Sequence, residues 1–335
     1  MTTTFAEATT VKPIDSHTYT ADFHPNWCIG SVPHGGYVTS CFLRVASAHF
    51  STTLRSQNQP HTLFLHLNFL RRTSLGSVIF TVTESKLGRR TSTIHISLAL
   101  TSNPQSPCVV GYLTQTNLHH ETGITLPTCY ALSPPPLPLS STKALKEDKD
   151  PNWNLYQKPF PKFRKAGNHV ATYLPRKSLI GGGAVIDQWL RPTNPQERFT
   201  QETLGYISDA FPQIIETVYS ASVLDNALNK SSSKTTDPES QSQPSTTSSE
   251  QEADKSHWAR FWYPTVVLNI EFKKALPEQG VEWLFSRVKA KKIEKGRMDL
   301  EVEVRDEAGE VVALSQHVAL ILGAERNMSG RGAKL

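Results

Sequence analysis

The sequence predicts an α+β fold in which two antiparallel sheets are each wrapped round a long helix. Residues 35–50 carry two neighbouring columns of apolar side chains at four-residue spacing: Tyr37, Cys41 and Val45, and Val38, Phe42 and Ala46. Such columns give a helix a wide buried face. Closely spaced stretches of alternating apolar residues follow, as expected of an antiparallel meander. The same order returns in the second half, which indicates a duplicated unit.

The first unit covers residues 12–117. A strand over residues 17–28 ends in Trp27-Cys-Ile-Gly, and Ser31-Val-Pro-His-Gly-Gly-Tyr37 leads into the helix, which extends to about Phe50. Strand signals follow at residues 63–69, 78–82, 94–100 and 108–116. Glycine and proline residues mark the turns between them.

Three stretches depart from this pattern. Residues 118–165 contain Ser133-Pro-Pro-Pro-Leu-Pro-Leu and a charged run from Lys143 to Asp150, and we expect an extended linker that joins neither a sheet nor a helix. Residues 221–257 are rich in Ser, Thr and Gln and have almost no large apolar residue after Leu228, which predicts a disordered insertion. Residues 327–335 are expected to form a flexible tail.

The second unit covers residues 166–326 and contains a long helix candidate at residues 198–218. Asp209 lies inside its apolar stripe, where a carboxylate is costly unless a neighbouring group uses it. Pro212 removes a backbone donor, so we expect the helix to kink near Asp209. The alternative is an aspartate at the water-facing edge of an ordinary core helix. Strands are expected at residues 166–173, 184–190, 265–272, 281–293, 297–305 and 310–322.

Short sequence matches support the duplication. Leu65-His-Leu-Asn-Phe-Leu-Arg-Arg corresponds to Leu268-Asn-Ile-Glu-Phe-Lys-Lys, and Lys86-Leu-Gly-Arg corresponds to Lys295-Gly-Arg. Near the end of each half, Val109-Val-Gly-Tyr-Leu-Thr-Gln115 corresponds to Val311-Val-Ala-Leu-Ser-Gln316. The two copies are offset by about two hundred residues.

The composition excludes several classes of function. Charged residues make up 19% of the chain and the net charge is +5, which is not typical of a nucleic-acid-binding arm but is compatible with an anionic small ligand. We therefore expect no nucleic-acid partner. The cysteines have no paired spacing, which favours free thiols over disulfides or a zinc site. No stretch reaches the length that spans a bilayer, so we expect no stable membrane insertion.

The order of motifs resembles the double-hotdog acyl-CoA thioesterases, the thioesterase II type and its fungal thioesterase-like relatives. The resemblance rests on Trp27-Cys-Ile-Gly and Pro33-His-Gly-Gly-Tyr37 in the first half, and on Ser208-Asp209-Ala, Thr265 and Ser315-Gln316 in the second. It implies a double hotdog fold and hydrolysis of acyl-CoA, with CoA as part of the substrate and no further cofactor. Tyr37 replaces a Gln of the bacterial pattern, which leaves the shape of the acyl group open.

The resemblance also implies roles for three residues of the second half. Asp209 would act as general base on a water that Thr265 and Gln316 orient, and the water would attack the thioester without an acyl-enzyme. Gln316 shares its strand parity with the apolar residues around it, so we expect it to face the interior and to need a partner such as Asp209. A Gln bonded to nearby backbone is the alternative, since Gln115 matches it in the first half.

The first helix is expected to bind the developing oxyanion at its N-terminus. Amides near Gly36 and Tyr37 would point outward there, and Gly35 and Gly36 would let the substrate approach closely. A tight turn into the helix accounts for the two glycines equally well.

Other chemistries fit the sequence less well. Cys28 and His34 are close together, but cysteine is usually an inert apolar residue. The His119-His120 pair has no further ligands, so no metal site is expected. A hotdog hydratase or dehydratase would need a His–carboxylate pair at the acyl β-carbon, for which His34 is the candidate. A non-catalytic protein that binds acyl thioesters in secondary metabolism is the non-enzymatic alternative.

The C-terminal Ala333-Lys334-Leu335 is similar to the Ser-Lys-Leu class of peroxisomal addresses. We therefore expect a peroxisomal import receptor as a partner, and a cytoplasmic location otherwise. The sequence leaves open whether the two halves close within a monomer or pair further in a homodimer.

Overall fold

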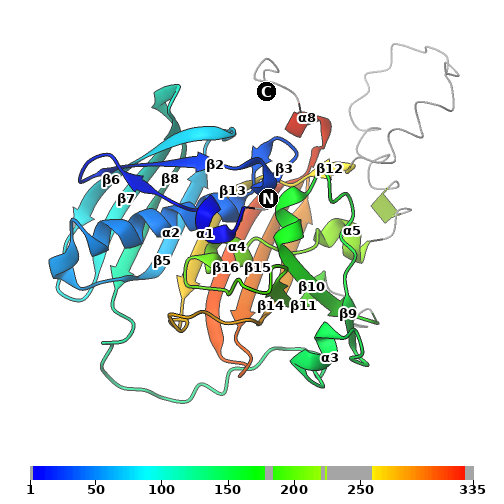
Figure 1. The fold of residues 1–335 in the computed structure, drawn as a ribbon. Helices are drawn as coiled ribbons and strands as arrows, with labels where there is room; N and C mark the ends of the chain where they lie inside the picture. The colour runs from blue at the N-terminus through cyan, green and yellow to red at the C-terminus, as the bar shows by residue number, and fades with distance from the viewer. Residues whose placement is uncertain (1–2, 178–183, 220–222, 225–258, 329–335) are drawn as a thin grey trace, which may run out of the picture.

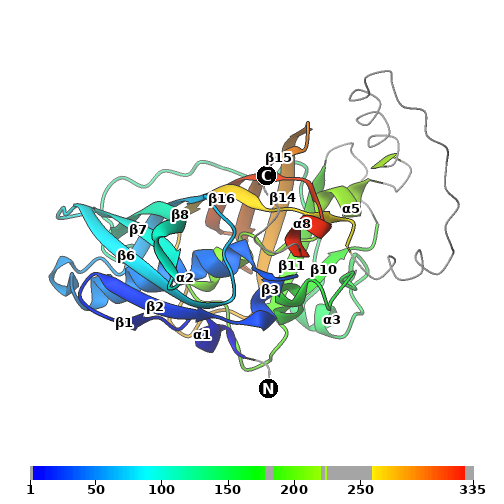
Figure 2. The same ribbon diagram turned by 90° about the horizontal axis from the view of Figure 1, so that it is seen from above.

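The computed structural model describes residues 3–177, 184–219, 223–224 and 259–328. In this part of the chain thirteen strands form one antiparallel sheet, in the order β1-β2-β6-β7-β8-β5-β13-β16-β15-β14-β11-β10-β9. The strands of the first half form one wing of this sheet and those of the second half the other (Figures 1 and 2).

The first half contributes six strands to the sheet: β1 (Lys12–Pro13), β2 (Thr18–Phe23), β5 (His61–Phe69), β6 (Gly76–Lys86), β7 (Ser92–Leu100) and β8 (Asn103–Thr116). Its helices and short turns are α1 (Phe5–Ala8), η1 (Pro25–Trp27), α2 (Gly35–Ser51) and η2 (Arg55–Gln57), with the small hairpin β3 (Cys28–Ile29) and β4 (Val32–Pro33). The long helix α2 lies where the sequence predicts it.

The second half contributes seven strands: β9 (Trp153–Leu155), β10 (Val170–Pro175), β11 (Val185–Pro192), β13 (Thr265–Phe272), β14 (Leu284–Glu294), β15 (Arg297–Arg305) and β16 (Val311–Leu320). Its helices are short: α3 (Thr142–Lys146), η3 (Lys165–His169), α4 (Thr203–Ile207), α5 (Ile214–Val218) and α8 (Glu325–Met328). A separate pair is formed by β12 (Phe261–Trp262) and β17 (Leu322–Gly323).

The two halves meet at the β5–β13 ladder, and the duplication read from the sequence is visible there. Leu67 pairs with Leu268 and Leu65 with Ile270, so the matched segments lie across the junction from each other. On either side the order is mirrored, because β8, β7 and β6 follow β5 as β16, β15 and β14 follow β13. Polar side chains also cross this junction, with His66 Nδ1 2.6 Å from Asn269 Oδ1.

The fold differs from the expectation of two sheets with a long helix each. Hydrogen bonds between β5 and β13 join the two wings into one sheet. The helix predicted over residues 198–218 is two short helices, α4 and α5, with non-helical backbone between Ser208 and Gln213. Pro212 lies in this break and helps to cause it, because a proline cannot donate the helical hydrogen bond. Asp209 therefore follows a helix end, and the predicted kink is a complete interruption.

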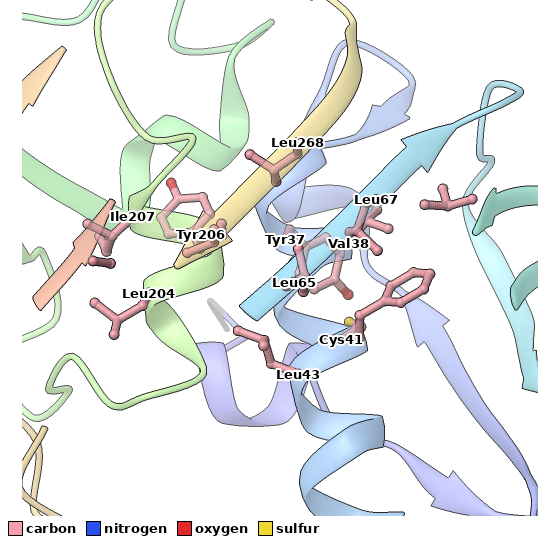
Figure 3. Close-up of a cluster of buried hydrophobic side chains, with 14 of the residues drawn as sticks. Tyr37, Val38, Cys41, Leu43, Leu65, Leu67, Leu204, Tyr206, Ile207 and Leu268 are labelled. Carbon is pink, nitrogen blue, oxygen red and sulfur yellow. The ribbon is translucent and has the colours of Figure 1, made fainter. Parts of the chain in front are cut away.

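Helices α2 and α4 pack closely where two glycines meet. A Cβ on Gly36 would lie 2.9 Å from the carbonyl oxygen of Gly205, and a Cβ on Gly205 would lie 2.9 Å from Ser40 Oγ. The absence of side chains at both positions lets the backbones approach. Around this crossing, Figure 3 shows Tyr37, Val38 and Cys41 of α2 near Leu65 and Leu67 of β5. The crossing brings the end of α4 to the start of α2.

The prediction that residues 118–165 join neither a helix nor the sheet is wrong for their second part. Ser141 caps α3 through a hydrogen bond from the Ala144 amide, and β9 extends the sheet beside β10. Leu145 and Trp153 are buried in a cluster with Tyr173, and this burial stabilises the segment despite its charges.

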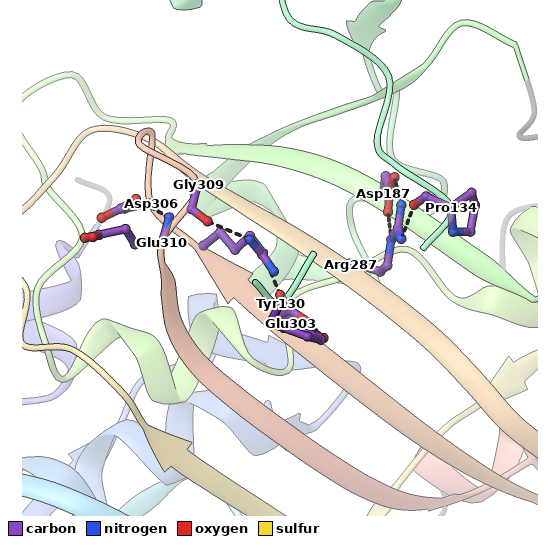
Figure 4. Close-up of polar contacts among 9 residues, drawn as sticks. Tyr130, Pro134, Asp187, Arg287, Glu303, Asp306, Gly309 and Glu310 are labelled. Atoms are coloured by element: carbon purple, nitrogen blue, oxygen red, sulfur yellow. Dashed lines mark hydrogen bonds and ion pairs between the residues drawn. The ribbon is translucent and has the colours of Figure 1, made fainter. Parts of the chain in front are cut away.

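The proline-rich part of this segment runs along the second wing and is held there by polar contacts (Figure 4). Tyr130 donates its hydroxyl hydrogen to Glu303 Oε2 at 2.6 Å. Arg287 donates to the Pro134 carbonyl at 2.6 Å and makes a two-pronged ion pair with the buried Asp187, at 2.6 and 2.7 Å. A fully buried carboxylate needs such a partner.

The flexible tail was predicted to begin at residue 327, which is too early, because α8 extends to Met328. Asn327 is fully buried in α8, where its side chain accepts from the Ser31 amide and donates to the Ile29 carbonyl. The address Ala333-Lys334-Leu335 and nearly all of the predicted insertion, residues 221–257, lie outside the described residues. No helix within the described ranges is both long enough and apolar enough to cross a membrane.

Candidate active site

Asp209 of the second half lies against the N-terminus of α2 in the first half. Its carboxylate is 13% exposed, and Oδ2 accepts a hydrogen bond from the Gly36 amide at 2.7 Å. The first amides of a helix have no intrahelical acceptor and carry the positive end of its dipole, so they favour an anion. The carboxylate that looked costly in the sequence is thus stabilised by the other half of the molecule.

Two histidines flank this carboxylate. His34 Nδ1 lies 3.5 Å from Asp209 Oδ2, and His317 Nδ1 lies 3.7 Å from Asp209 Oδ1. Burial lowers the pKa of both histidines, although the charge of Asp209 opposes the shift. Both rings are therefore neutral near pH 7, and each keeps one nitrogen as a hydrogen-bond acceptor.

His34 caps α2, and this fixes which of its nitrogens carries the proton. Its Nδ1 accepts a hydrogen bond from the Gly36 amide at 3.1 Å, so in the neutral ring the proton lies on Nε2. His34 also lines a pocket together with Ala210, the residue that follows Asp209. The cap therefore presents a donor on the side away from the helix.

His317 belongs to a chain of polar groups on the inner face of β16. The Ser315 hydroxyl donates to the Asn269 carbonyl at 2.8 Å and lies 2.9 Å from His317 Nε2. Having given its only proton to the carbonyl, Ser315 accepts from Nε2, which leaves the Nδ1 lone pair directed towards Asp209. Nδ1 has no hydrogen-bond partner among the described residues. His317 Nδ1 and Asp209 Oδ1 are both acceptors, so their close approach needs a donor between them, and a water molecule can provide one.

A pocket adjoins Asp209 and its two flanking histidines. His34, Tyr206, Ala210 and Phe211 line it near Asp209, and Lys158 and Arg164 line it further away. Burial lowers the pKa of Lys158 to about 7, while Arg164 is paired with Glu216 at 2.7 Å. The pocket wall thus combines aromatic rings with two basic side chains.

Comparisons with known proteins agree on one family. A family model for the acyl-CoA thioesterase N-terminal domain matches residues 23–116, and one for the acyl-CoA thioesterase C-terminal domain matches residues 141–321. The thioesterase-like protein TwmA of Talaromyces wortmannii is 41% identical over 338 residues, which cover 96% of this chain and 93% of TwmA. The chain belongs to the acyl-CoA thioesterase family.

Solved structures show the same fold at low sequence identity. A putative thioesterase II from Thermobifida fusca superposes with a TM-score of 0.63 at 18% identity, covering 95% of this chain and 97% of that one. A hot dog protein of unknown function from Alicyclobacillus acidocaldarius gives a TM-score of 0.66 at 15% identity, covering 96% and 98%. These likenesses confirm the hotdog fold predicted from the sequence.

The structure places Gln316 differently from the expectation for this family member. The strand parity was wrong: Ser315 and His317 are buried on the inner face of β16, and Gln316 is exposed on the other. The strand pairs also correct the alignment of the two halves. Leu65 pairs with Leu113, and its counterpart Leu268 pairs with His317. His317 thus matches Leu113, and the correspondence of Gln115 with Gln316 was misaligned.

Small and polar side chains occupy the inner face of β16 because the residues after α4 approach it closely. The Phe211 and His317 rings lie 5.9 Å apart, edge to face. The larger apolar residues of β16, such as Leu314 and Leu320, are only half-buried on the other side. An apolar stripe was therefore a misleading guide to the interior.

The other predicted site residues differ in whether they contact Asp209. Thr265 opens β13 opposite Ala319, on the same face as His317, and no hydrogen bond joins it to Asp209 in the described structure. The Gly36 amide already donates to Asp209 and His34, which corrects the expectation of a free oxyanion donor there.

The Tyr37 side chain is fully buried and donates its hydroxyl hydrogen to the Ala8 carbonyl, so it cannot reach a substrate. Gly35 lies beside the carboxylate, where a Cβ would be 2.9 Å from Asp209 Oδ2.

Cys28 is not a reactive partner for His34. Its thiol is buried, and this burial raises its pKa to about 12. A thiol that stays protonated near pH 7 is a poor nucleophile.

Proposed function

We propose that this protein hydrolyses an acyl-CoA thioester to a free acid and CoA, with Asp209 as the general base. The observation that carries the proposal is the Asp209 carboxylate, which is held between the two halves by the Gly36 amide and whose neighbours His34 and Ala210 line a pocket. Family membership supplies the substrate class. No thiol nucleophile accompanies this carboxylate, which favours direct attack by water.

In this proposal a water molecule binds between Asp209 Oδ1 and His317 Nδ1, the two acceptors that face each other. Asp209 takes one proton as the water oxygen forms a bond to the thioester carbon. The carbon–sulfur bond of the resulting intermediate then breaks, and the CoA thiolate takes the proton back from Asp209. His317 and Ser315 take over the orienting role that was expected of Gln316, while the same role for Thr265 stays a prediction.

The negative oxygen of the intermediate needs hydrogen-bond donors, and three belong to residues at or near the start of α2. His34, which lines the pocket, has its proton on Nε2, and the amides of Gly35 and Tyr37 belong to the first turn of α2. Donors already in place when charge develops lower the barrier without reorganisation. We assign this role to His34 together with the start of α2.

A second candidate function rests on the His34–Asp209 pair itself. A hydratase or dehydratase needs a histidine and a carboxyl group that act together at the acyl β-carbon, and here the two groups lie 3.5 Å apart. In this reading Asp209 would take the proton, because the Nδ1 lone pair of His34 already accepts from the Gly36 amide, and His34 would donate from Nε2. This chemistry would act on an enoyl-CoA or a 3-hydroxyacyl-CoA and leave the thioester intact.

One experiment separates these functions. The purified chain is incubated with a panel of saturated, enoyl and 3-hydroxyacyl-CoA thioesters, while thiol release and enoyl absorbance are followed in parallel. Hydrolysis predicts thiol release from saturated acyl-CoA. Loss of the enoyl absorbance without thiol release would support the hydratase instead, and binding without either signal would support the non-catalytic alternative.

A further inference from the structure

A second polar cluster lies at the far end of α2 and plays no part in the proposed hydrolysis. It consists of His17 before β2, His49 in the last turn of α2 and Glu84 in β6. His34 and His49 are fifteen positions apart on the same helix, which is about 22 Å along its axis. The cluster is therefore independent of Asp209.

The ligand atoms of these three residues converge. His17 Nε2 lies 3.2 Å from Glu84 Oε1, and His49 Nε2 lies 3.5 Å from the same oxygen. One ligand atom from each residue lies within 4.8 Å of the other two. Ligands about 2.0–2.2 Å from a tetrahedral zinc ion are separated by roughly 3.3–3.5 Å, so the cluster has nearly the required spacing.

The histidines are also oriented as metal ligands are. The Ser16 hydroxyl lies 2.8 Å from His17 Nδ1, and the Tyr19 hydroxyl lies 3.2 Å from His49 Nδ1. A hydrogen bond to the second nitrogen fixes the ring and leaves Nε2 for the ion. The loop that carries His17 is itself held, because Thr53 donates to the Ser16 carbonyl at 2.9 Å.

His49 supplies an independent sign that a ligand is missing. Its side chain has no exposed surface, and its Nε2 makes no hydrogen bond to any described residue. Its contact with Glu84 Oε1, at 3.5 Å, is too long for a good hydrogen bond, and an ion bound between the two atoms would satisfy both. The position also favours a cation, because the C-terminal end of a helix carries partial negative charge.

We propose that His17, His49 and Glu84 form a binding site for a zinc-like divalent cation, with water as the fourth ligand. The ion ties the loop before β2 to α2 and β6, three parts of the first half that are far apart in the sequence. Two imidazoles and one carboxylate are typical ligands of zinc, whereas calcium and magnesium prefer oxygen ligands. The site stabilises the first half and takes no part in the reaction at Asp209.

The test uses the full chain without a histidine tag. Zinc stoichiometry is measured after dialysis, zinc affinity by chelator competition, and the thermal midpoint with and without zinc; cobalt(II) reports the geometry through its visible absorption. Wild type is expected to bind about one zinc ion and to unfold at a higher temperature with zinc. His17→Gln and Glu84→Gln should each weaken binding at least about tenfold.

The matched control is His120→Gln, which removes an exposed histidine of the same half outside the cluster. It should bind zinc like wild type. Because His17 and Glu84 are partly exposed, their replacement is not expected to prevent folding, and circular dichroism checks this. The proposal is overturned if wild type binds no zinc, or if the His17→Gln/Glu84→Gln double variant binds it as tightly as wild type.

Discussion

The Gly36 amide of the first half donates a hydrogen bond to the Asp209 carboxylate of the second half, at 2.7 Å. The proposed base therefore exists only because the two copies of the duplicated unit meet. Neither copy alone contains both the anion and the helix end that stabilises it. Fusion of the copies into one sheet fixes this contact.

Replacement of Gly36 by Ala should destabilise the protein and lower its activity. The new Cβ would lie 2.9 Å from Asp209 Cβ, the Gly205 carbonyl oxygen and Tyr206 Cα, most of it immovable backbone. Overpacking of this kind costs about 1–3 kcal/mol, which urea unfolding can measure. Gly167→Ala is the control, since its Cβ would meet only Lys158 Cδ at 3.6 Å. Equal stability of the two variants would contradict the close helix crossing.

Neighbouring residues of β16 should respond in opposite ways. His317→Leu removes the acceptor beside Asp209 and should lower turnover at least tenfold, whereas Gln316→Ala changes an exposed side chain and should leave turnover near wild type. Thiol release at saturating substrate compares the two. If Gln316→Ala were the more damaging change, the assignment of the water-orienting role to His317 would be wrong.

The free energy of unfolding should fall as the pH is lowered below about 6.5. The pKa of His34 and of His317 is lowered by burial, so below the ordinary histidine value the unfolded chain binds protons that the folded chain does not. Stability is then complete above about pH 6.5 and declines until the pH reaches the lowered folded values, by up to about 1.4 kcal/mol per unit for each histidine. Urea unfolding between about pH 7.5 and about pH 5.5 tests this. His120→Gln should keep the wild-type slope, and His317→Asn should reduce it.

Removal of one partner of the Arg287–Asp187 pair should be strongly destabilising. Arg287→Met would leave the fully buried Asp187 without its two-pronged partner, at a cost of about 3–5 kcal/mol. The double change Asp187→Leu/Arg287→Met should recover much of that loss, because no charge is then left buried. Lys292→Met, in an exposed pair with Glu294, is the control and should change stability by less than about 1 kcal/mol. A similar loss from both single variants would argue against the buried pair.

The sequence was sufficient for much of the fold, for physical reasons. The α2 columns and the alternating strands have the periodicity that burial imposes, so their positions agree closely with the structure. The second helix was overextended, because apolar spacing continues past Pro212 although the backbone does not. The contribution of α3 and β9 was missed because Leu145 and Trp153 are isolated apolar residues whose burial depends on distant partners.

The site was only partly predictable. Asp209 was recognisable as a carboxylate in an apolar run, whereas His34 was expected only as the candidate histidine of a hydratase. The roles of His317 and Ser315 depend on strand register, which a one-residue error reverses. The cluster of His17, His49 and Glu84 has no sequence signature, since its members lie on a loop, a helix and a strand that only the fold brings together.

The central claim is that Asp209 activates the water that attacks the thioester, and the most direct measurement is single-turnover thiol release by wild type and Asp209→Asn. The variant keeps the shape of the side chain and can still accept the Gly36 hydrogen bond. We expect unchanged circular dichroism and a rate at least about 100-fold lower than wild type. A folded Asp209→Asn variant with the wild-type rate would contradict the account.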